Sequence, residues 1–275
     1  KKKFITFIFY HLSVFVIKDL LGCIMKRAEL DEIADKIFRS HQVEVRDVEA
    51  GEEPFVYSTG NRGPGYLMIK GLVGQRKVLK FLTMQLALRV AELYGKEFDF
   101  VEGNATGGMI PAWQLTDDIE KVLDMEEGSI PFAYLCGSRK RGGHGEHLTG
   151  DRNNDLFHEG MKGLVVEELV NYAGTTSNAA LALRDMKYGA TNGACLLTYD
   201  HPESNKRLAD VGLTLNPLIT LPQLLDIGEA NREITSEAVT SYREFLGNPV
   251  KWQLERGLVI PETAVGAAES QGYSM

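Results

Sequence analysis

Short apolar segments alternate with helical segments through most of this chain. Strands are expected over Phe98–Glu102, Pro131–Cys136, Gly163–Glu167, Ala194–Tyr199 and Leu218–Leu221, and helices over Pro111–Leu123, Thr175–Lys187 and from Pro222 onward. A helix between two strands makes the strands parallel neighbours, so this alternation predicts an α/β fold with a central parallel sheet flanked by helices. Ligands of such sheets bind beyond the carboxyl ends of the strands, so the residues that follow each strand are the site candidates.

The segment before this alternation predicts a smaller structure. Apolar residues at three- and four-residue spacing predict a helix over Ala28–Ser40. Two β-rich runs, Pro54–Ser58 and Tyr66–Ile69, flank a stretch of turn residues and predict a hairpin. A helix over Lys77–Tyr94 follows and ends at Gly95.

Charge and composition exclude several classes of protein. The 275 residues carry a formal net charge of −8, which argues against a dedicated nucleic-acid binder because phosphate contacts need an excess of lysine and arginine. The three cysteines lack metal-ligand or disulfide-framework spacing, which favours free thiols in a reducing compartment. No membrane-spanning segment follows residue 24, so we expect a cytoplasmic protein without a membrane partner.

The two ends of the chain are expected to lie outside the main domain. Residues 1–24 combine three lysines with an apolar run, which imitates a secretory signal but also fits an upstream extension preceding a start at Met25. We take 1–24 as the extension, 25–250 as the domain and 251–275 as a C-terminal tail.

Two of the strands are followed by loops that suit an anion. The turn Gly103–Gly108, which contains Gly107, follows the first strand, and its glycines would let backbone amides approach a phosphate. A cationic, glycine-flanked loop follows the second strand and supplies Arg139, Lys140, Arg141 and His144. A structural turn and a solvated surface loop are the alternative interpretations of these two segments.

The third strand is followed by a more specific combination. Glu167 and Glu168 form an acid pair that can accept hydrogen bonds from two vicinal hydroxyls or hold a hydrated Mg²⁺. A turn at the start of the next helix supplies amides, hydroxyls and a favourable dipole for a phosphate, through Ala173, Gly174, Thr175, Thr176 and Ser177. An acid pair beside an anion cradle predicts a site for a phosphorylated sugar; a capped helix with two exposed glutamates is the alternative.

Motifs in the same order resemble those of orotate phosphoribosyltransferases, which are type I phosphoribosyltransferases. The resemblance covers roughly residues 30–250. It is carried by Thr59-Gly60 with Pro64 and Tyr66, Phe100–Gly103, His144-Gly145-Glu146, Val165–Glu168 with Ala173–Thr175, and Pro217–Leu221. It implies the type I phosphoribosyltransferase fold, with a small N-terminal hood-like hairpin.

The resemblance also implies a reaction and its parts. The ribose 5-phosphate group of phosphoribosyl pyrophosphate would pass to orotate with Mg²⁺ as cofactor, in pyrimidine nucleotide biosynthesis, in a homodimer. The acid pair would hold the ribose hydroxyls, the turn Ala173–Ser177 the 5′-phosphate, and the loop with Arg139, Lys140, Arg141 and His144 the pyrophosphate. Gly107 would lie in a substrate-binding turn, and Tyr66 beside the acceptor base, orotate or another base.

Several motif positions depart from the family's pattern. The acid pair is usually Asp-Asp, Gly107 stands where a lysine is usual, and His201 stands where an arginine follows the fourth core strand. A second lysine of the mobile loop is replaced by Gly142-Gly143. Each lost charge-assisted contact is worth roughly 1.5–3 kcal/mol, so reduced activity, or a divergent sugar-phosphate-binding protein without catalysis, is the alternative function.

Overall fold

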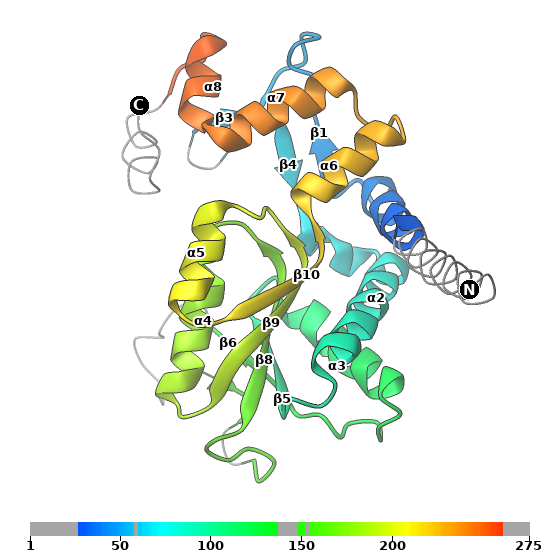
Figure 1. Cartoon of the computed structure of the whole chain (residues 1–275), viewed down its shortest axis with the longest axis vertical. Helices are drawn as coiled ribbons and strands as arrows, with labels where there is room; N and C mark the ends of the chain where they lie inside the picture. Colours follow the sequence, from blue (N-terminus) through cyan, green and yellow to red (C-terminus); the bar gives the residue numbers. More distant parts are fainter. Residues whose placement is uncertain (1–26, 58–59, 137–147, 152–153, 261–275) are drawn as a thin grey trace, which may run out of the picture.

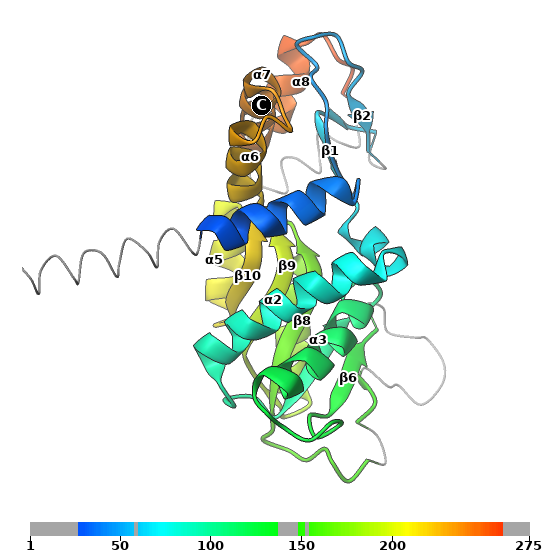
Figure 2. The ribbon, with the colours of Figure 1, turned by 90° about the vertical axis from the view of Figure 1, so that its right-hand side faces the viewer.

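The structure is a computed structural model that describes residues 27–57, 60–136, 148–151 and 154–260. The chain forms a lower part built around a sheet and an upper part, which we call the hood and which consists of residues 43–57, 60–67 and 221–255 (Figure 1). A helix over 27–39 lies near the junction of the two parts (Figure 2). Residues 1–24, and the tail beyond 260, are outside the described ranges.

The lower part contains the parallel sheet that the sequence predicts. Its six strands, in spatial order, are β10 (Thr214–Thr220), β9 (Gly189–Thr198), β8 (Lys162–Val170), β5 (Phe100–Asn104), β6 (Phe132–Leu135) and β7 (Leu148–Thr149). All neighbouring pairs are parallel except β6 and β7. The α/β fold with a central, mostly parallel sheet is therefore confirmed, and the short antiparallel edge strand β7 is an addition that the sequence did not indicate.

Helices cover both faces of this sheet (Figures 1 and 2). One face packs against α2 (Arg76–Tyr94) and α3 (Met109–Val122), and the other against α4 (Gly174–Asp185) and α5 (Pro202–Asp210). Three of these helices lie close to the predicted ranges; α5 was missed because its sequence, PESNKRLAD, presents few apolar residues. None of the helices in the described part of the chain has the length and apolar character needed to cross a bilayer.

The small strands of the hood pair differently from the prediction. A hairpin between 54–58 and 66–69 is wrong, because β2 (Phe55–Val56) pairs with β3 (Arg62–Gly63), while β4 (Gly65–Leu67) pairs with β1 (Val43–Val45). Pro64 stands between β3 and β4 and has no N–H to donate, so the first ladder stops there. The chain then turns into a 3₁₀ helix, η1 (Ile69–Gly74).

The other half of the hood comes from the C-terminal part of the chain. It consists of α6 (Leu221–Ala230), α7 (Ser236–Gly247) and α8 (Pro249–Glu255), so the boundary expected at residue 250 falls inside α8. The Trp252 side chain is only 1% exposed, and Gln253 accepts a hydrogen bond from the Arg62 backbone N–H at 2.8 Å. The packed structure therefore extends past the expected start of the tail, because these side chains bury surface against β3 and α7.

Aromatic side chains pack the hood together and connect it to the end of the sheet. Gly65 leaves room for Tyr242 of α7, whose ring atoms lie 2.2 and 2.3 Å from where a Cβ on Gly65 would stand. The Tyr57 hydroxyl donates to the Gly65 carbonyl at 2.6 Å. Tyr242 in turn hydrogen-bonds Tyr199, which directly follows β9, so the hood lies over the carboxyl edge of the sheet.

Candidate functional site

The acid pair lies near the carboxyl end of β8. The strand continues to Val170, so Glu167 and Glu168 are inside it rather than at its last residue as predicted. Pairing with β5 ends at Gly103 and Val166, which leaves the following residues of β8 open on that side. Successive side chains of a strand point to opposite faces. Glu167 nevertheless contacts Asn104, the last residue of β5, and Glu168 lies against Gly107 in the turn that follows β5.

Glu167 joins the end of β5 to the start of α4. Its Oε1 accepts a hydrogen bond from Asn104 Nδ2 at 2.8 Å and one from Thr176 Oγ1 at 3.4 Å. The side chain is 6% exposed. The acid pair and the predicted phosphate turn are thus neighbours in space, one hydrogen bond apart. Asn104 was not identified as a site residue, although its position directly after a strand end was the available signal.

The Glu168 carboxylate lies where a side chain at position 107 would have to be. A Cβ on Gly107 would lie 1.7 Å from Oε1 of Glu168, so any larger side chain there would displace this carboxylate. In the resembled family a lysine side chain extends from this position. In this chain the carboxylate of Glu168 occupies the space beside the Gly107 backbone. Lys70, in η1, is close enough for its positive charge to favour the ionised form of Glu168.

Burial raises the pKa of both carboxyl groups. Burial, followed by repulsion from Glu168, raises the pKa of Glu167 to about 8. Burial also raises the pKa of Glu168, and Lys70 opposes part of that rise. Without a ligand, Glu167 therefore carries a proton at neutral pH, and it must lose that proton before it can accept hydrogen bonds from two hydroxyls with both oxygens.

The turn before α4 has the features of an anion cradle. Ala173 adopts a left-handed conformation with φ of 56°, and α4 starts at Gly174 with no side chain capping its first amides. The Ser177 hydroxyl is buried and has no hydrogen-bond partner among the described residues. Arg207 of α5 reaches the same turn, with Nη1 3.2 Å from where a Cβ on Gly174 would stand. Free amides, a hydroxyl and a cation thus surround the turn, while Thr175 is exposed.

An aromatic stack that the sequence did not reveal lies beside this turn. The His201 ring is nearly parallel to Tyr172, at 4.8 Å and 9°, and to Tyr199, at 5.6 Å and 20°. His201 is 7% exposed, and burial lowers its pKa, so its ring is neutral at pH 7. The position expected to carry a cation in the resembled family is therefore occupied by an uncharged ring.

The remaining predicted site residues lie on the hood or beyond the described ranges. Tyr66 is on β4 and is 40% exposed. Arg139, Lys140, Arg141 and His144 all fall in 137–147, outside the residues that the structure describes. Their predicted role stays a prediction. Of the cysteines, Cys195 is a buried free thiol and Cys136 a half-buried one.

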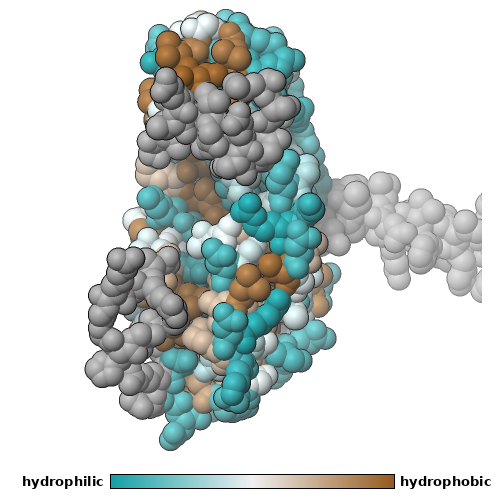
Figure 3. All heavy atoms as spheres, turned by 90° about the vertical axis from the view of Figure 1, so that its left-hand side faces the viewer, coloured by the Kyte–Doolittle hydropathy of each residue, from teal (hydrophilic) through white to brown (hydrophobic). Residues whose placement is uncertain are grey.

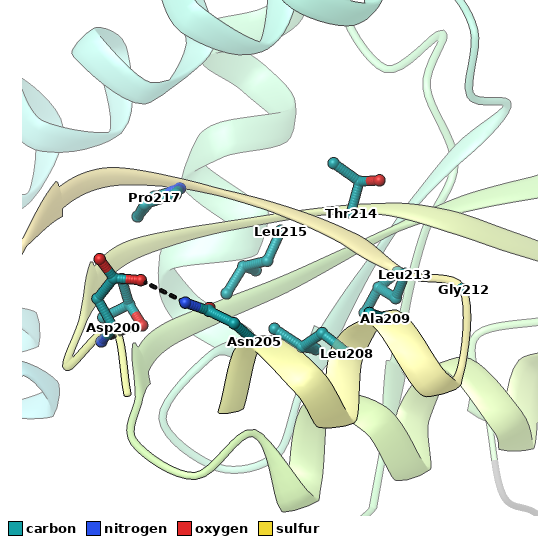
Figure 4. A pocket seen from close by; sticks show the side chains of 10 residues that line it. Asp200, Asn205, Leu208, Ala209, Gly212, Leu213, Thr214, Leu215 and Pro217 are labelled. Atoms are coloured by element: carbon teal, nitrogen blue, oxygen red, sulfur yellow. Dashed lines mark hydrogen bonds between the residues drawn. The ribbon is translucent and has the colours of Figure 1, made fainter. Parts of the chain in front are cut away.

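Two other surface features are separate from the acid pair. A pocket between α5 and β10 is lined mainly by apolar side chains, and the Asp200 carboxylate accepts a hydrogen bond from Asn205 Nδ2 at its rim at 2.8 Å (Figure 4). The hood carries the exposed apolar residues Val56 and Leu254, and Figure 3 shows hydrophobic atoms at its upper end. Neither place has an acid pair beside a helix start, so the carboxyl edge of β8 is the candidate site.

Comparisons with known proteins point to the same family as the motifs. No protein-family model matches the chain. The chain is 27% identical over 200 residues to an orotate phosphoribosyltransferase of Listeria monocytogenes, covering 73% of this chain and 88% of that protein. It is 26% identical over 229 residues to an orotate phosphoribosyltransferase of Enterococcus faecalis, covering 81% and 99%. The expected resemblance to orotate phosphoribosyltransferases is thereby confirmed.

Solved structures show the same fold. Orotate phosphoribosyltransferase from Aeropyrum pernix superposes with a TM-score of 0.53 at 22% identity, covering 70% of this chain and 97% of that one. UMP synthase from Leishmania donovani gives a TM-score of 0.60 at 20% identity, covering 79% of this chain. The match spans 42% of the length of that synthase. The fold of the chain is that of a type I phosphoribosyltransferase.

Proposed function

We propose that this protein transfers the ribose 5-phosphate group of phosphoribosyl pyrophosphate to orotate, forming orotidine monophosphate and pyrophosphate. The observation that carries the proposal is the hydrogen bond from Thr176 to Glu167, which joins an acid pair to an uncapped helix start. A phosphorylated pentose presents vicinal hydroxyls and a phosphate, and this arrangement offers a partner to each. The relatives' names supply the reaction class.

The sugar phosphate would be held by residues of β8 and α4. Glu167 and Glu168 would accept hydrogen bonds from the ribose hydroxyls. The 5′-phosphate would lie at the amides of Gly174, Thr175 and Thr176, where the helix dipole favours an anion. The unpartnered Ser177 hydroxyl supports this placement, because a buried hydroxyl without a partner is costly unless a ligand or water satisfies it.

The leaving pyrophosphate would be stabilised by positive charge and by backbone amides. As its bond to the sugar breaks, negative charge grows on the pyrophosphate and positive charge on the sugar. We assign Arg139, Lys140 and Arg141 to the pyrophosphate, and His144 as a further cation or hydrogen-bond donor. The turn with Gly107 would add backbone amides. The loop with Arg139, Lys140 and Arg141 would also exclude water and so protect the sugar from hydrolysis.

The site offers two of the oxygen-donor side chains that Mg²⁺ prefers. Glu167 and Glu168 offer the carboxylate oxygens that Mg²⁺ prefers, but no group of three potential metal-binding side chains occurs among the described residues. Glu168, which Lys70 helps to ionise, is the residue that would hold the ion together with substrate oxygens and water. When bound, the ion would supply positive charge to the leaving group.

The acceptor base would lie between the sheet edge and the hood. Tyr66 and the stack of Tyr172, His201 and Tyr199 offer aromatic surfaces there, and stacking on an aromatic ring is worth roughly 1–3 kcal/mol per base. A homodimer is part of the same proposal and would be checked by light scattering of the purified chain.

The test is an assay of the purified full chain with phosphoribosyl pyrophosphate, Mg²⁺ and orotate, following the loss of orotate. We expect turnover that Glu168→Ala abolishes, as does the double change Arg139→Ala with Lys140→Ala. The matched control is Glu92→Ala, which removes an exposed glutamate of α2 far from β8 and should leave turnover unchanged. Calorimetric binding of phosphoribosyl pyrophosphate without turnover of orotate, uracil or purine bases would contradict the proposal and favour a non-catalytic binding protein.

A further inference from the structure

An arginine outside the predicted motifs reaches the turn at which α4 begins. Arg207 lies in α5, and its Nη1 is 3.2 Å from the point where a Cβ on Gly174 would stand. Apart from the chain neighbours of Gly174, no other described side chain comes within 4 Å of that point. The Cα–Cβ bonds of a helix tilt toward its first residue, so Arg207 extends toward the carboxyl edge of the sheet, where α4 and α5 both begin.

The Arg207 guanidinium is not engaged by another described residue. No hydrogen bond or ion pair of this side chain occurs within the described ranges, although Glu203 and Asp210 stand four residues before it and three residues after it on the same helix. By contrast, the guanidinium of Arg184 on α4 donates to backbone carbonyls, among them that of Gly212 at 3.2 Å. The N–H donors of Arg207 are therefore available to an external anion, and α5 holds them beside the turn.

The turn itself presents polar groups that lack partners. No side chain caps the first amides of α4. Ser177, in the first part of this helix, is 3% exposed, and its hydroxyl has no hydrogen-bond partner among the described residues. Its Cβ tilts toward the helix start, so this hydroxyl points toward the turn that Arg207 reaches. A buried hydroxyl without a partner is costly, which indicates a ligand or water at this place.

Charge explains why a cation is needed at this turn. A helix start supplies about half a positive charge, whereas a phosphate monoester carries about −1.5 to −2 at pH 7. The helix α4 has no charged side chain before Arg184, and Glu167, one hydrogen bond from Thr176, adds negative charge when it is ionised. Backbone amides alone would leave at least about one unit of negative charge uncompensated. A charge-assisted hydrogen bond from Arg207 would supply the missing positive charge.

We propose that Arg207 is a binding residue for the phosphate group of the sugar. Its guanidinium donates hydrogen bonds to the phosphate oxygens, next to the first amides of α4 and the Ser177 hydroxyl. This positive charge makes the site select a pentose with a dianionic phosphate over the same pentose without one. The inference rests on the proposed function for the identity of the sugar, and it adds a residue of α5 to a site otherwise built from β8 and α4.

The first measurement is calorimetric binding of ribose 5-phosphate to the full chain without Mg²⁺. Arg207 is exposed, so its variants should fold. Arg207→Gln should raise the Kd about tenfold, through the loss of a hydrogen bond to a charged group, and Arg207→Lys, which keeps the charge without the planar fork, about threefold. The matched control Lys206→Gln removes an exposed charge from the adjacent position of α5 and should leave the Kd unchanged. Equal affinities of wild type and Arg207→Gln, or equal losses in Arg207→Gln and Lys206→Gln, would overturn the proposal.

The second measurement separates a contact with the phosphate from a general change in the fold. Phosphorus NMR follows the titration of bound ribose 5-phosphate, a phosphate monoester whose second pKa is about 6 in solution. A guanidinium beside the phosphate favours the dianion, so the pKa of the bound ester should be lower on the wild type than on Arg207→Gln. The same pKa on both proteins would overturn the proposal.

Turnover of phosphoribosyl pyrophosphate and orotate tests the proposed function separately. Binding of ribose 5-phosphate that depends on Arg207, in a chain without turnover, would refute the proposed function and support this inference. Turnover with a KM for phosphoribosyl pyrophosphate that is the same in wild type and Arg207→Gln would support the proposed function and overturn this inference. A wild type that binds no ribose 5-phosphate would likewise overturn it.

Discussion

Gly107→Ala tests whether the position of the Glu168 carboxylate matters for turnover. The new Cβ would lie 1.7 Å from Oε1, 2.1 Å from the carboxyl carbon and 2.4 Å from Oε2 of Glu168. Ordinary contact begins at 3.4 Å, so the carboxylate must move by about 1.7 Å. The obstructed group is the end of a flexible side chain, so it can rotate away without unfolding the protein.

The size of the effect follows from this displacement. A misplacement of about 1 Å at a reacting centre can cost 100-fold, and each tenfold is worth about 1.36 kcal/mol. We therefore expect kcat/KM for phosphoribosyl pyrophosphate to fall at least about 100-fold, or about 2.7 kcal/mol, while the free energy of unfolding changes by less than about 1 kcal/mol.

The assay is steady-state turnover of orotate at saturating Mg²⁺, combined with denaturant unfolding. Gly74→Ala is the matched control, because a Cβ at Gly74 meets nothing within 4 Å. It should leave turnover unchanged. If Gly107→Ala keeps kcat/KM within threefold of wild type, the placement of Glu168 against the glycine turn has no part in substrate binding, and the reasoning is refuted.

Three further outcomes are expected. Thr176→Val removes the hydroxyl that donates to Glu167 at 3.4 Å, and should weaken calorimetric binding of phosphoribosyl pyrophosphate about fivefold, for a lost hydrogen bond of ~1 kcal/mol; unchanged affinity would contradict the link between cradle and acid pair. Burial raises the pKa of Glu167 from 4.5 to about 8, so the native state holds a proton that the unfolded chain has released, and stability should fall as pH rises through this window, by up to ~1.4 kcal/mol per pH unit. Glu167→Gln should reduce that slope in denaturant titrations, and a slope equal to wild type would show that Glu167 is not protonated. Gly65→Ala places a Cβ 2.2 Å from the buried Tyr242 ring and should cost about 1–3 kcal/mol of unfolding free energy, seen as a lower Tm. The control Gly247→Ala, at an exposed position where a Cβ meets nothing within 4 Å, should change Tm little, and an unaltered Tm in Gly65→Ala would show that the hood repacks freely.

Local patterns in the sequence were sufficient for the sheet and for the acid pair. The strands and most covering helices follow from apolar periodicity, which is a property of neighbouring residues. The same holds for the motif order that carries the family resemblance. Glu167, Glu168 and the turn Ala173–Ser177 were singled out as candidates because ligands of parallel sheets bind where strands end, and the structure brings them together.

Contacts between distant segments required the tertiary structure. The hood joins residues near 43–67 to helices after 221, and the pairing of β4 with β1 depends on Pro64 and on Tyr242, which lies far along the chain. The contact between Asn104 and Glu167 likewise arises only because β5 lies beside β8 in this register.

The sequence alone thus determined most strands and helices of the lower part and singled out the candidate site residues, because propensity and periodicity act over a few residues. Only the tertiary structure decided the charge states of those residues. Burial and the approach of Glu168 set the pKa of Glu167, and the room at Gly107 sets where Glu168 points. Desolvation and electrostatic repulsion depend on distances in space, which the order of residues does not contain.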